Sequence, residues 1–167
     1  MVIAILLLLI SACVGAFAYL TDADRATNTL TVGGVNVGIV EEFDPPKEIV
    51  PGVAFTKDVK VQNNGPSNCY VRIKAVFTDS DMEKYCSVDW NTSDFVYNDE
   101  DGYYYYKGEL EVGELTKSLF TTVTVSDSIP EAEIKDFDIL VYTEAYQSNG
   151  FDNYEEAWEH YHRNKPV

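Results

Sequence analysis

Apolar and polar residues alternate with a period of two along most of the chain. The clearest stretch is CYVRIKAVF, residues 69–77, where the odd positions from Cys69 to Phe77 are apolar and Arg72 and Lys74 lie between them. Such alternation predicts a strand with one buried face. Further strand-like stretches occupy 29–40, 56–63, 94–106, 118–126 and 136–146.

Turn residues separate these stretches and indicate the fold class. Asn64-Gly65 predicts the turn of a hairpin over 56–77, and Gly33-Gly34 interrupts 29–40 as a turn or a bulge. The acidic loop within 94–106 predicts two short strands around it. Many short strands with turns between them predict an all-β protein, an antiparallel β-sandwich of jelly-roll or immunoglobulin-like type.

The period changes near the C-terminus. In FDNYEEAWEHYHR, residues 151–163, the spacing of the aromatic residues and Ala157 predicts a short helix over 153–163 with one apolar face. Asp152 and Glu155 have the spacing of a capping box. We expect this helix to seal one edge or end of a sandwich domain that spans 29–167.

The N-terminus begins with twenty uncharged residues, enough to cross a bilayer as a helix. The run ends in Ala16-Phe17-Ala18, the small-x-small pattern of a signal peptidase site. We therefore predict a signal peptide over 1–18, cleaved before Tyr19. A lipid-modified Cys13 and a retained anchor are the alternatives, and all three export the remainder, to the cell surface or the extracellular space.

Charge and cysteine content limit the binding partners and the cross-links that the chain can have. The chain carries a formal net charge of −16, which disfavours nucleic acid and anionic lipid as partners. The 13% aromatic content favours a packed domain. Cys69 and Cys86 follow the predicted cleavage site, and in an exported chain they are either a disulfide or two buried thiols. A structural zinc requires four ligands, so two cysteines alone do not predict one.

Three blocks of the chain resemble a known family. They are GAFAYLTD at 15–22, ATNTLTVGGVNVGI at 26–39, and IVPGVAFTKDVKVQNNGPSNCYVRIKA at 49–75. DGYYYYKGELEVGELTKSLF at 101–120 and GFDNYEEAWEHY at 150–161 extend the likeness over nearly the whole chain. Together they resemble the TasA/camelysin-like family of secreted Gram-positive proteins with a SipW-type signal peptide, in particular its clostridial members.

The resemblance implies a β-sandwich that is exported and forms fibres. In TasA-like fibres, the segment freed by cleavage completes the sheet of a neighbouring subunit, a form of strand addition. Here that donor segment lies within 19–33, with Tyr19, Leu20, Leu30 and Val32 as its apolar residues. The alternative is a polar leader over 19–28 followed by an ordinary first strand of the chain's own domain.

The sequence contains no recognisable catalytic motif. It has two histidines, His160 and His162, and no H-E-x-x-H pattern. Two positions apart on a helix, they point to nearly opposite faces and indicate a solvated helix end rather than a shared zinc. We therefore predict no enzyme, no catalytic residue and no metal centre. A camelysin-like metallopeptidase is a remote alternative.

Two binding interpretations remain. Asn98, Asp99 and Asp101 of the acidic loop could offer oxygens to Ca²⁺, although a hairpin loop of this type needs no ion. Of Tyr103–Tyr106, one alternating pair could stack on a sugar or a partner, although cross-strand packing also accounts for it. The leading function is a secreted, self-polymerising structural subunit, and the alternative is a monomeric cell-surface adhesin or binding module.

Overall fold

The computed structural model describes residues 28–31 and 34–164 of the chain. The predicted signal peptide 1–18, with Ala16 and Ala18, and the residues Tyr19, Leu20 and Val32 lie outside the described residues. Within the described part, no helix has the length and apolar character needed to cross a membrane.

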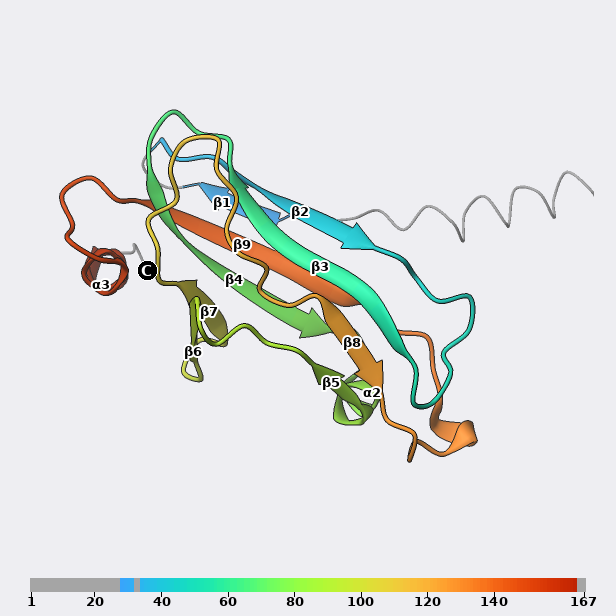
Figure 1. Ribbon diagram of the computed structural model, residues 1–167. Helices are drawn as coiled ribbons and strands as arrows, with labels where there is room; N and C mark the ends of the chain where they lie inside the picture. Colours follow the sequence, from blue (N-terminus) through green and yellow to red (C-terminus); the bar gives the residue numbers. More distant parts are fainter. Residues whose placement is uncertain (1–27, 32–33, 165–167) are drawn as a thin grey trace, which may run out of the picture.

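Two β-sheets pack face to face, as Figure 1 shows, so the prediction of an all-β sandwich is confirmed. The five-stranded sheet has the order β1 (Asn28–Thr31), β9 (Ile139–Gln147), β4 (Cys69–Phe77), β7 (Tyr103–Tyr106) and β6 (Phe95–Asn98). The four-stranded sheet has the order β2 (Val37–Phe43), β3 (Ala54–Asn63), β8 (Thr122–Val125) and β5 (Cys86–Val88). All pairings are antiparallel except that of β1 with β9.

Three short helices complete the described fold. The helix α2 (Ser80–Tyr85) joins β4 to β5, and the 3₁₀ turn η1 (Glu131–Glu133) precedes β9. The helix α3 (Tyr154–Asn164) follows β9 and lies at the end of the sandwich far from η1 (Figure 1).

The core lies between the two sheets and follows the predicted alternation. Cys69, Val71 and Ile73 of β4 are completely buried, and Ala75 and Phe77 pack against the same cluster. The opposing sheet contributes mainly valines, and β9 adds its own alternate positions: Val37, Val59, Val61, Val123, Ile139, Val141 and Ala145. Each buried aliphatic side chain stabilises the fold by roughly 1.5–3 kcal/mol.

The predicted hairpin over 56–77 is wrong. β3 and β4 lie in different sheets, and the loop after Asn63 carries the chain from one sheet to the other. Asn63 is completely buried, and its side-chain amide donates to the carbonyls of Ser67 and Leu110 while its oxygen accepts from the Gly65 N–H. A Cβ at Gly65 would lie 2.7 Å from the backbone nitrogen of Asn36, so this crossover requires glycine.

The stretch 29–40 contains two strands rather than one. β1 belongs to the five-stranded sheet and β2 to the four-stranded sheet. Between them Gly34 adopts a φ of 77°, a conformation that L side chains rarely adopt. Gly34 therefore lies in the connection that takes the chain from one sheet to the other.

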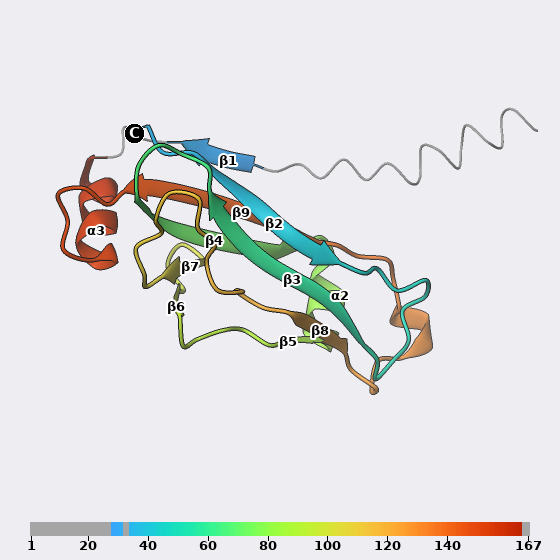
Figure 2. The ribbon, with the colours of Figure 1, turned by 45° about the horizontal axis from the view of Figure 1, so that its top comes forward.

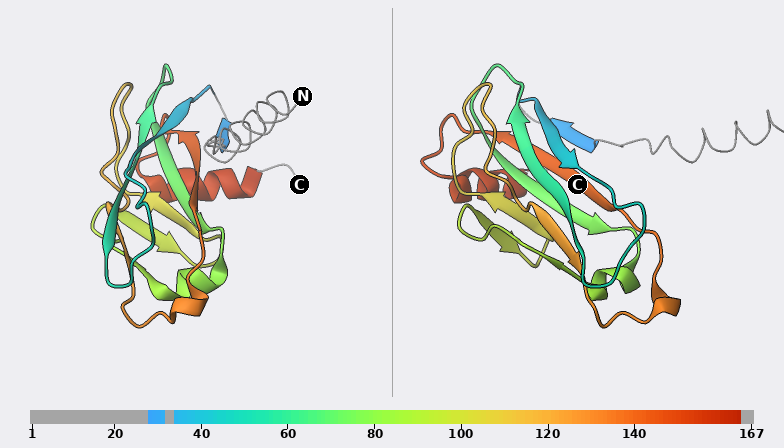
Figure 3. Two further views of the ribbon diagram at one scale, coloured as in Figure 1. Left: turned by 90° about the vertical axis from the view of Figure 1, so that its right-hand side faces the viewer. Right: turned by 45° about the vertical axis from the view of Figure 1, so that its right-hand side comes forward.

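The helix α3 covers a face of the five-stranded sheet. It lies at one end of the sandwich, as expected, and in Figure 3 (left) it packs there on the side of β4 and β9 that faces away from β3. Its N-terminal cap is one residue later than predicted. The Asn153 oxygen accepts from the Glu156 N–H, and the Glu156 carboxylate accepts from the Asp152 N–H.

Candidate functional site

The strand β1 forms one edge of the five-stranded sheet, beside β9 (Figure 2). It pairs in parallel with β9 over four residues, from Asn28 opposite Tyr142 to Thr31 opposite Ala145. Leu30 lies opposite Glu144 and is the only predicted donor-strand residue within the described part. This pairing lies within one chain. It is therefore the arrangement expected if the segment is an ordinary first strand of its own domain. Whether the segment also pairs with a neighbouring copy stays a prediction.

The most densely connected polar group lies on the outer face of the same sheet, between the sheet and α3. On this face Arg72 of β4 is flanked by Tyr105 of β7 and Glu144 of β9, its partners in the strand register. The Arg72 side chain is only 3% exposed. Alternation had placed Arg72 on the polar face, but α3 covers that face here.

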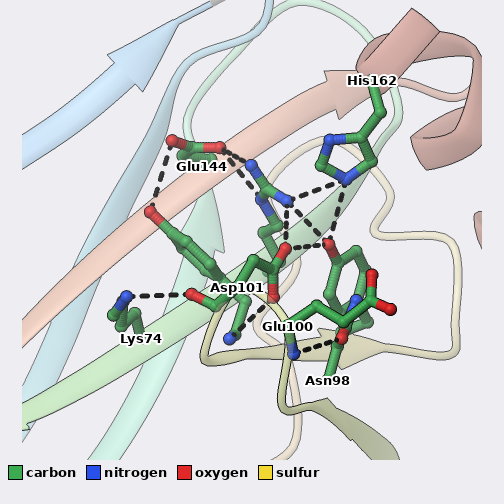
Figure 4. A network of polar contacts seen from close by, with 9 residues as sticks. Lys74, Asn98, Glu100, Asp101, Glu144 and His162 are labelled. Carbon is green, nitrogen blue, oxygen red and sulfur yellow. Dashed lines mark hydrogen bonds and ion pairs between the residues drawn. The ribbon is translucent and has the colours of Figure 1, made fainter.

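Carboxylates and ring atoms surround the Arg72 guanidinium (Figure 4). Its Nε and Nη2 donate to Glu144, and Nη1 donates to Asp101 Oδ2 at 2.8 Å. Nη1 also donates to the Tyr105 hydroxyl at 2.6 Å and lies 3.1 Å from His162 Nε2.

Electrostatics explain how the charge is tolerated there. Burial disfavours the charged guanidinium, but the hydrogen bond and charge of Glu144, with Tyr105, outweigh it and raise the pKa of Arg72 above its ordinary value. Tyr105 donates in turn to Asp101 at 2.5 Å. Burial, then this hydrogen bond, raises the pKa of Tyr105 to about 12. The carboxylates thus hold the arginine charged and the phenol neutral.

Aromatic rings enclose the same guanidinium. Its central carbon lies 4.3 Å from the ring centre of Tyr103 and 4.6 Å from that of Trp158, with Tyr161 and Tyr105 at 5.3 and 5.5 Å. These distances are within the range of cation–π attraction. Since Trp158 and Tyr161 belong to α3, Arg72 joins the C-terminal helix to the sheet.

The two histidines differ at the end of α3, because His160 is half-buried whereas His162 is exposed, as the prediction of a solvated helix end requires. His160 Nδ1 lies 3.0 Å from the Tyr146 hydroxyl, and the His160 ring stacks on Tyr146 and packs against Phe151. His162 contacts Arg72 and Tyr105 as described. Both histidines therefore contact residues of the five-stranded sheet.

The acidic loop is built around donors of this chain. Asp101 accepts from Arg72, Tyr105 and its own loop's Tyr103 N–H, and the Asn98 side-chain oxygen accepts from the Glu100 N–H (Figure 4). In the part of the chain that the structure describes, no three His, Cys, Asp or Glu side chains form a group able to hold a metal. Calcium binding at Asn98, Asp99 and Asp101 stays an untested prediction, without geometric support.

The tyrosine run alternates as predicted. Tyr104 and Tyr106 face the core, where Tyr104 stacks on Trp90 at 4.7 Å between ring centres. Tyr103 and Tyr105 face outward but are covered by Arg72 and α3. The second pair is therefore not a free stacking platform.

The two cysteines of the domain are not joined. Cys69 begins β4, whereas Cys86 follows α2 beyond the other end of the nine-residue strand, and both thiols are free. Nine strand residues span about 26 Å, far more than a disulfide bridges. The disulfide alternative is therefore wrong. Burial raises the pKa of the Cys69 thiol to about 12 and that of the partly buried Cys86 to about 11.

Comparison of the chain with protein-family models, with curated proteins and with solved structures found no match.

Proposed function

We propose that the protein is an exported structural subunit of surface or extracellular-matrix fibres, and that copies join by strand addition. The segment 19–33 of one copy would lie along the β9 edge of the next. The observation that supports the proposal is the pairing of Asn28–Thr31 with β9 within one chain, because an identical copy offers the same edge to this segment.

The pairing within one chain is compatible with exchange between chains. A strand that pairs with its own domain can make the same contacts with an identical domain, which is how swapped assemblies form. β1 covers only Tyr142–Ala145 of the nine residues in β9. The rest of that edge has no β1 partner among the described residues, so a longer donor segment would gain further backbone hydrogen bonds there.

Charge opposes assembly at low ionic strength. Subunits with a formal net charge of −16 repel one another, and physiological salt screens this repulsion over roughly 8 Å. Assembly should therefore accelerate as salt concentration rises.

Electron microscopy and light scattering of two chains test the proposal. The chain beginning at Tyr19 should form filaments, faster with added salt. The chain that lacks Tyr19–Asn28 should stay monomeric with nearly the same melting temperature. If the longer chain stays monomeric at all salt and protein concentrations, or the shortened chain still forms filaments, strand addition is contradicted. A monomeric adhesin, favoured by the pairing of β1 with its own β9, then takes its place.

A further inference from the structure

A groove of about 360 Å³ lies between the β6–β7 hairpin and α3, next to the Arg72 site but on the solvent side. It belongs to a different part of the molecule from the β1 edge. Aromatic rings from β7 and α3 share its lining with two carboxylates: Tyr105, Tyr154, Trp158, Asp99 and Glu155.

The aromatic rings of this groove differ in how far they are exposed to a ligand. Tyr154 is half-buried and can meet a ligand, whereas Trp158 and Tyr105 form the buried floor. The floor already holds one cation on its other side. The Arg72 guanidinium carbon is 4.6 Å from the Trp158 ring centre. The aromatic lining is thus of a kind that accepts a guanidinium.

The charges around the groove are predominantly negative. Asp99 and Glu155 are exposed, and Glu100 is exposed beside Asp99 in the same loop. The guanidinium of Arg72 is paired with Asp101 and Glu144, so its charge does not offset these groups. His162 also lines the groove, and its Nε2 lies 3.1 Å from Arg72 Nη1.

We propose that this groove binds the cationic end of a lysine or arginine side chain presented by a partner protein. The aromatic rings would contact the alkyl stem and the charged group, and Asp99 and Glu155 would pair with the charge. The charge complementarity extends to the whole molecule, since a surface of net charge −16 attracts basic partners. This inference does not depend on fibre formation.

A side-chain titration followed by NMR tests the proposal. The probes are the capped tripeptides acetyl-Gly-Arg-Gly-amide and acetyl-Gly-Lys-Gly-amide, with acetyl-Gly-Gln-Gly-amide as the neutral comparison. The chain has two tryptophans. The indole signal of Trp158 should shift with the cationic peptides, while that of Trp90, stacked on Tyr104 and packed against Phe120, should not.

Matched variants locate the effect. Asp99→Asn combined with Glu155→Gln should weaken binding of the arginine peptide about tenfold, and added salt should weaken it in the unaltered protein. Glu100→Gln removes the same charge one residue away, outside the groove, and should change affinity less than about twofold. Melting temperatures of the variants verify that each is folded, since all three positions are exposed.

Three results would overturn the proposal. The first is equal binding of the glutamine peptide, and the second is equal weakening by Glu100→Gln and by the groove variants. The third is a Trp158 shift caused by a neutral oligosaccharide and not by the cationic peptides, which would make the groove a saccharide site.

Discussion

The first and last described elements of the chain both pack on the five-stranded sheet, but different interactions hold them. β1 is a four-residue edge strand held in parallel register by β9. The helix α3 places three residues against the outer face, Ala157, Trp158 and Tyr161, each at most 5% exposed, around the charge of Arg72.

The difference in free energy between the two attachments is large. A few backbone hydrogen bonds at a sheet edge contribute roughly 1 kcal/mol each, and parallel pairing is slightly the weaker kind. Burial of large aromatic side chains contributes roughly 1.5–3 kcal/mol each. The C-terminal helix is therefore a fixed part of the domain, and the N-terminal strand is the element suited to exchange.

The largest expected effect is at Trp158. Trp158→Ala should lower the free energy of unfolding by about 4 kcal/mol, because it empties the space between α3 and the sheet and removes a ring from Arg72. Denaturant unfolding measures this. Glu159→Ala, at the exposed neighbouring position, should change stability by less than about 0.5 kcal/mol. A loss below about 1 kcal/mol for Trp158→Ala would mean that α3 is not an anchor.

The next effect is at Arg72. Arg72→Met should cost about 3 kcal/mol, because it leaves the carboxylates of Asp101 and Glu144 without their positive partner in a covered site. The combination Arg72→Met, Asp101→Asn and Glu144→Gln should recover most of that loss.

Lys74→Met is the matched control on the same strand. Lys74 makes one hydrogen bond, to the Asp101 carbonyl, and its loss should cost less than about 1 kcal/mol. If Arg72→Met and Lys74→Met have equal effects in chemical denaturation, the guanidinium does not hold the helix.

Alkaline pH should weaken the same attachment. Burial, then the charge of Glu144, raises the pKa of Tyr103 to about 12, and Tyr105 also reaches about 12, from an ordinary value of 10. Between pH 10 and pH 12 the unfolded chain has therefore released phenolic protons that the folded chain retains. The free energy of unfolding falls as pH rises through this range.

Melting temperature against pH measures that decline. Tyr105→Phe and Tyr103→Phe should each make it shallower. The buried Cys69 thiol, with its pKa raised from 9.0 to about 12, adds to the decline in every variant. A slope that is the same in all variants would separate alkaline unfolding from the Arg72 site.

The sequence pattern correctly predicts which residues are buried on the inner face of the five-stranded sheet. It does not predict the burial of the outer face, for a physical reason. Alternation identifies Val71 and Ile73 as core because their neighbours on both sheets are apolar. The same alternation labels Arg72 as exposed, since a period of two cannot indicate what covers the polar face. The aromatic residues on that face, such as Tyr70 and Tyr103, and those of α3 were the available signal.

The alternation of apolar and polar residues also does not indicate which strands pair with one another. Asn64-Gly65 between two alternating stretches is equally compatible with a hairpin and with a crossing between sheets. The contacts that decide it, from Asn63 to Leu110, join residues far apart in the sequence. Cys69 and Cys86 show the same limit, because the spacing of two cysteines does not reveal the strand that separates them.

The smallest expected effect on stability is at β1. Removal of Tyr19–Asn28 takes away one of the four β1 register pairs, that of Asn28 with Tyr142, and should lower the free energy of unfolding by less than about 1 kcal/mol. Thermal unfolding of the shortened monomer measures it. A loss comparable to that of Trp158→Ala would make β1 an integral strand and argue against exchange.

The central claim is that the segment around β1 of one copy pairs with β9 of another. Asn28 and Tyr142 are direct register partners, so cysteines at these positions should be close enough for a disulfide wherever the pairing forms. One protein carries Asn28→Cys and a second carries Tyr142→Cys, both beginning at Tyr19. Asn28→Cys mixed with Glu159→Cys is the control, because Glu159 is exposed on α3 and is not a register partner of β1.

Mass spectrometry of the mixed proteins after mild oxidation at physiological salt gives the most direct test. The account predicts a disulfide between the two introduced cysteines, joining the Asn28→Cys chain to the Tyr142→Cys chain. That disulfide should be absent from the Glu159→Cys control and from the proteins mixed at low salt. If the two introduced cysteines join only when one chain carries both substitutions, β1 stays on its own domain and strand addition is contradicted.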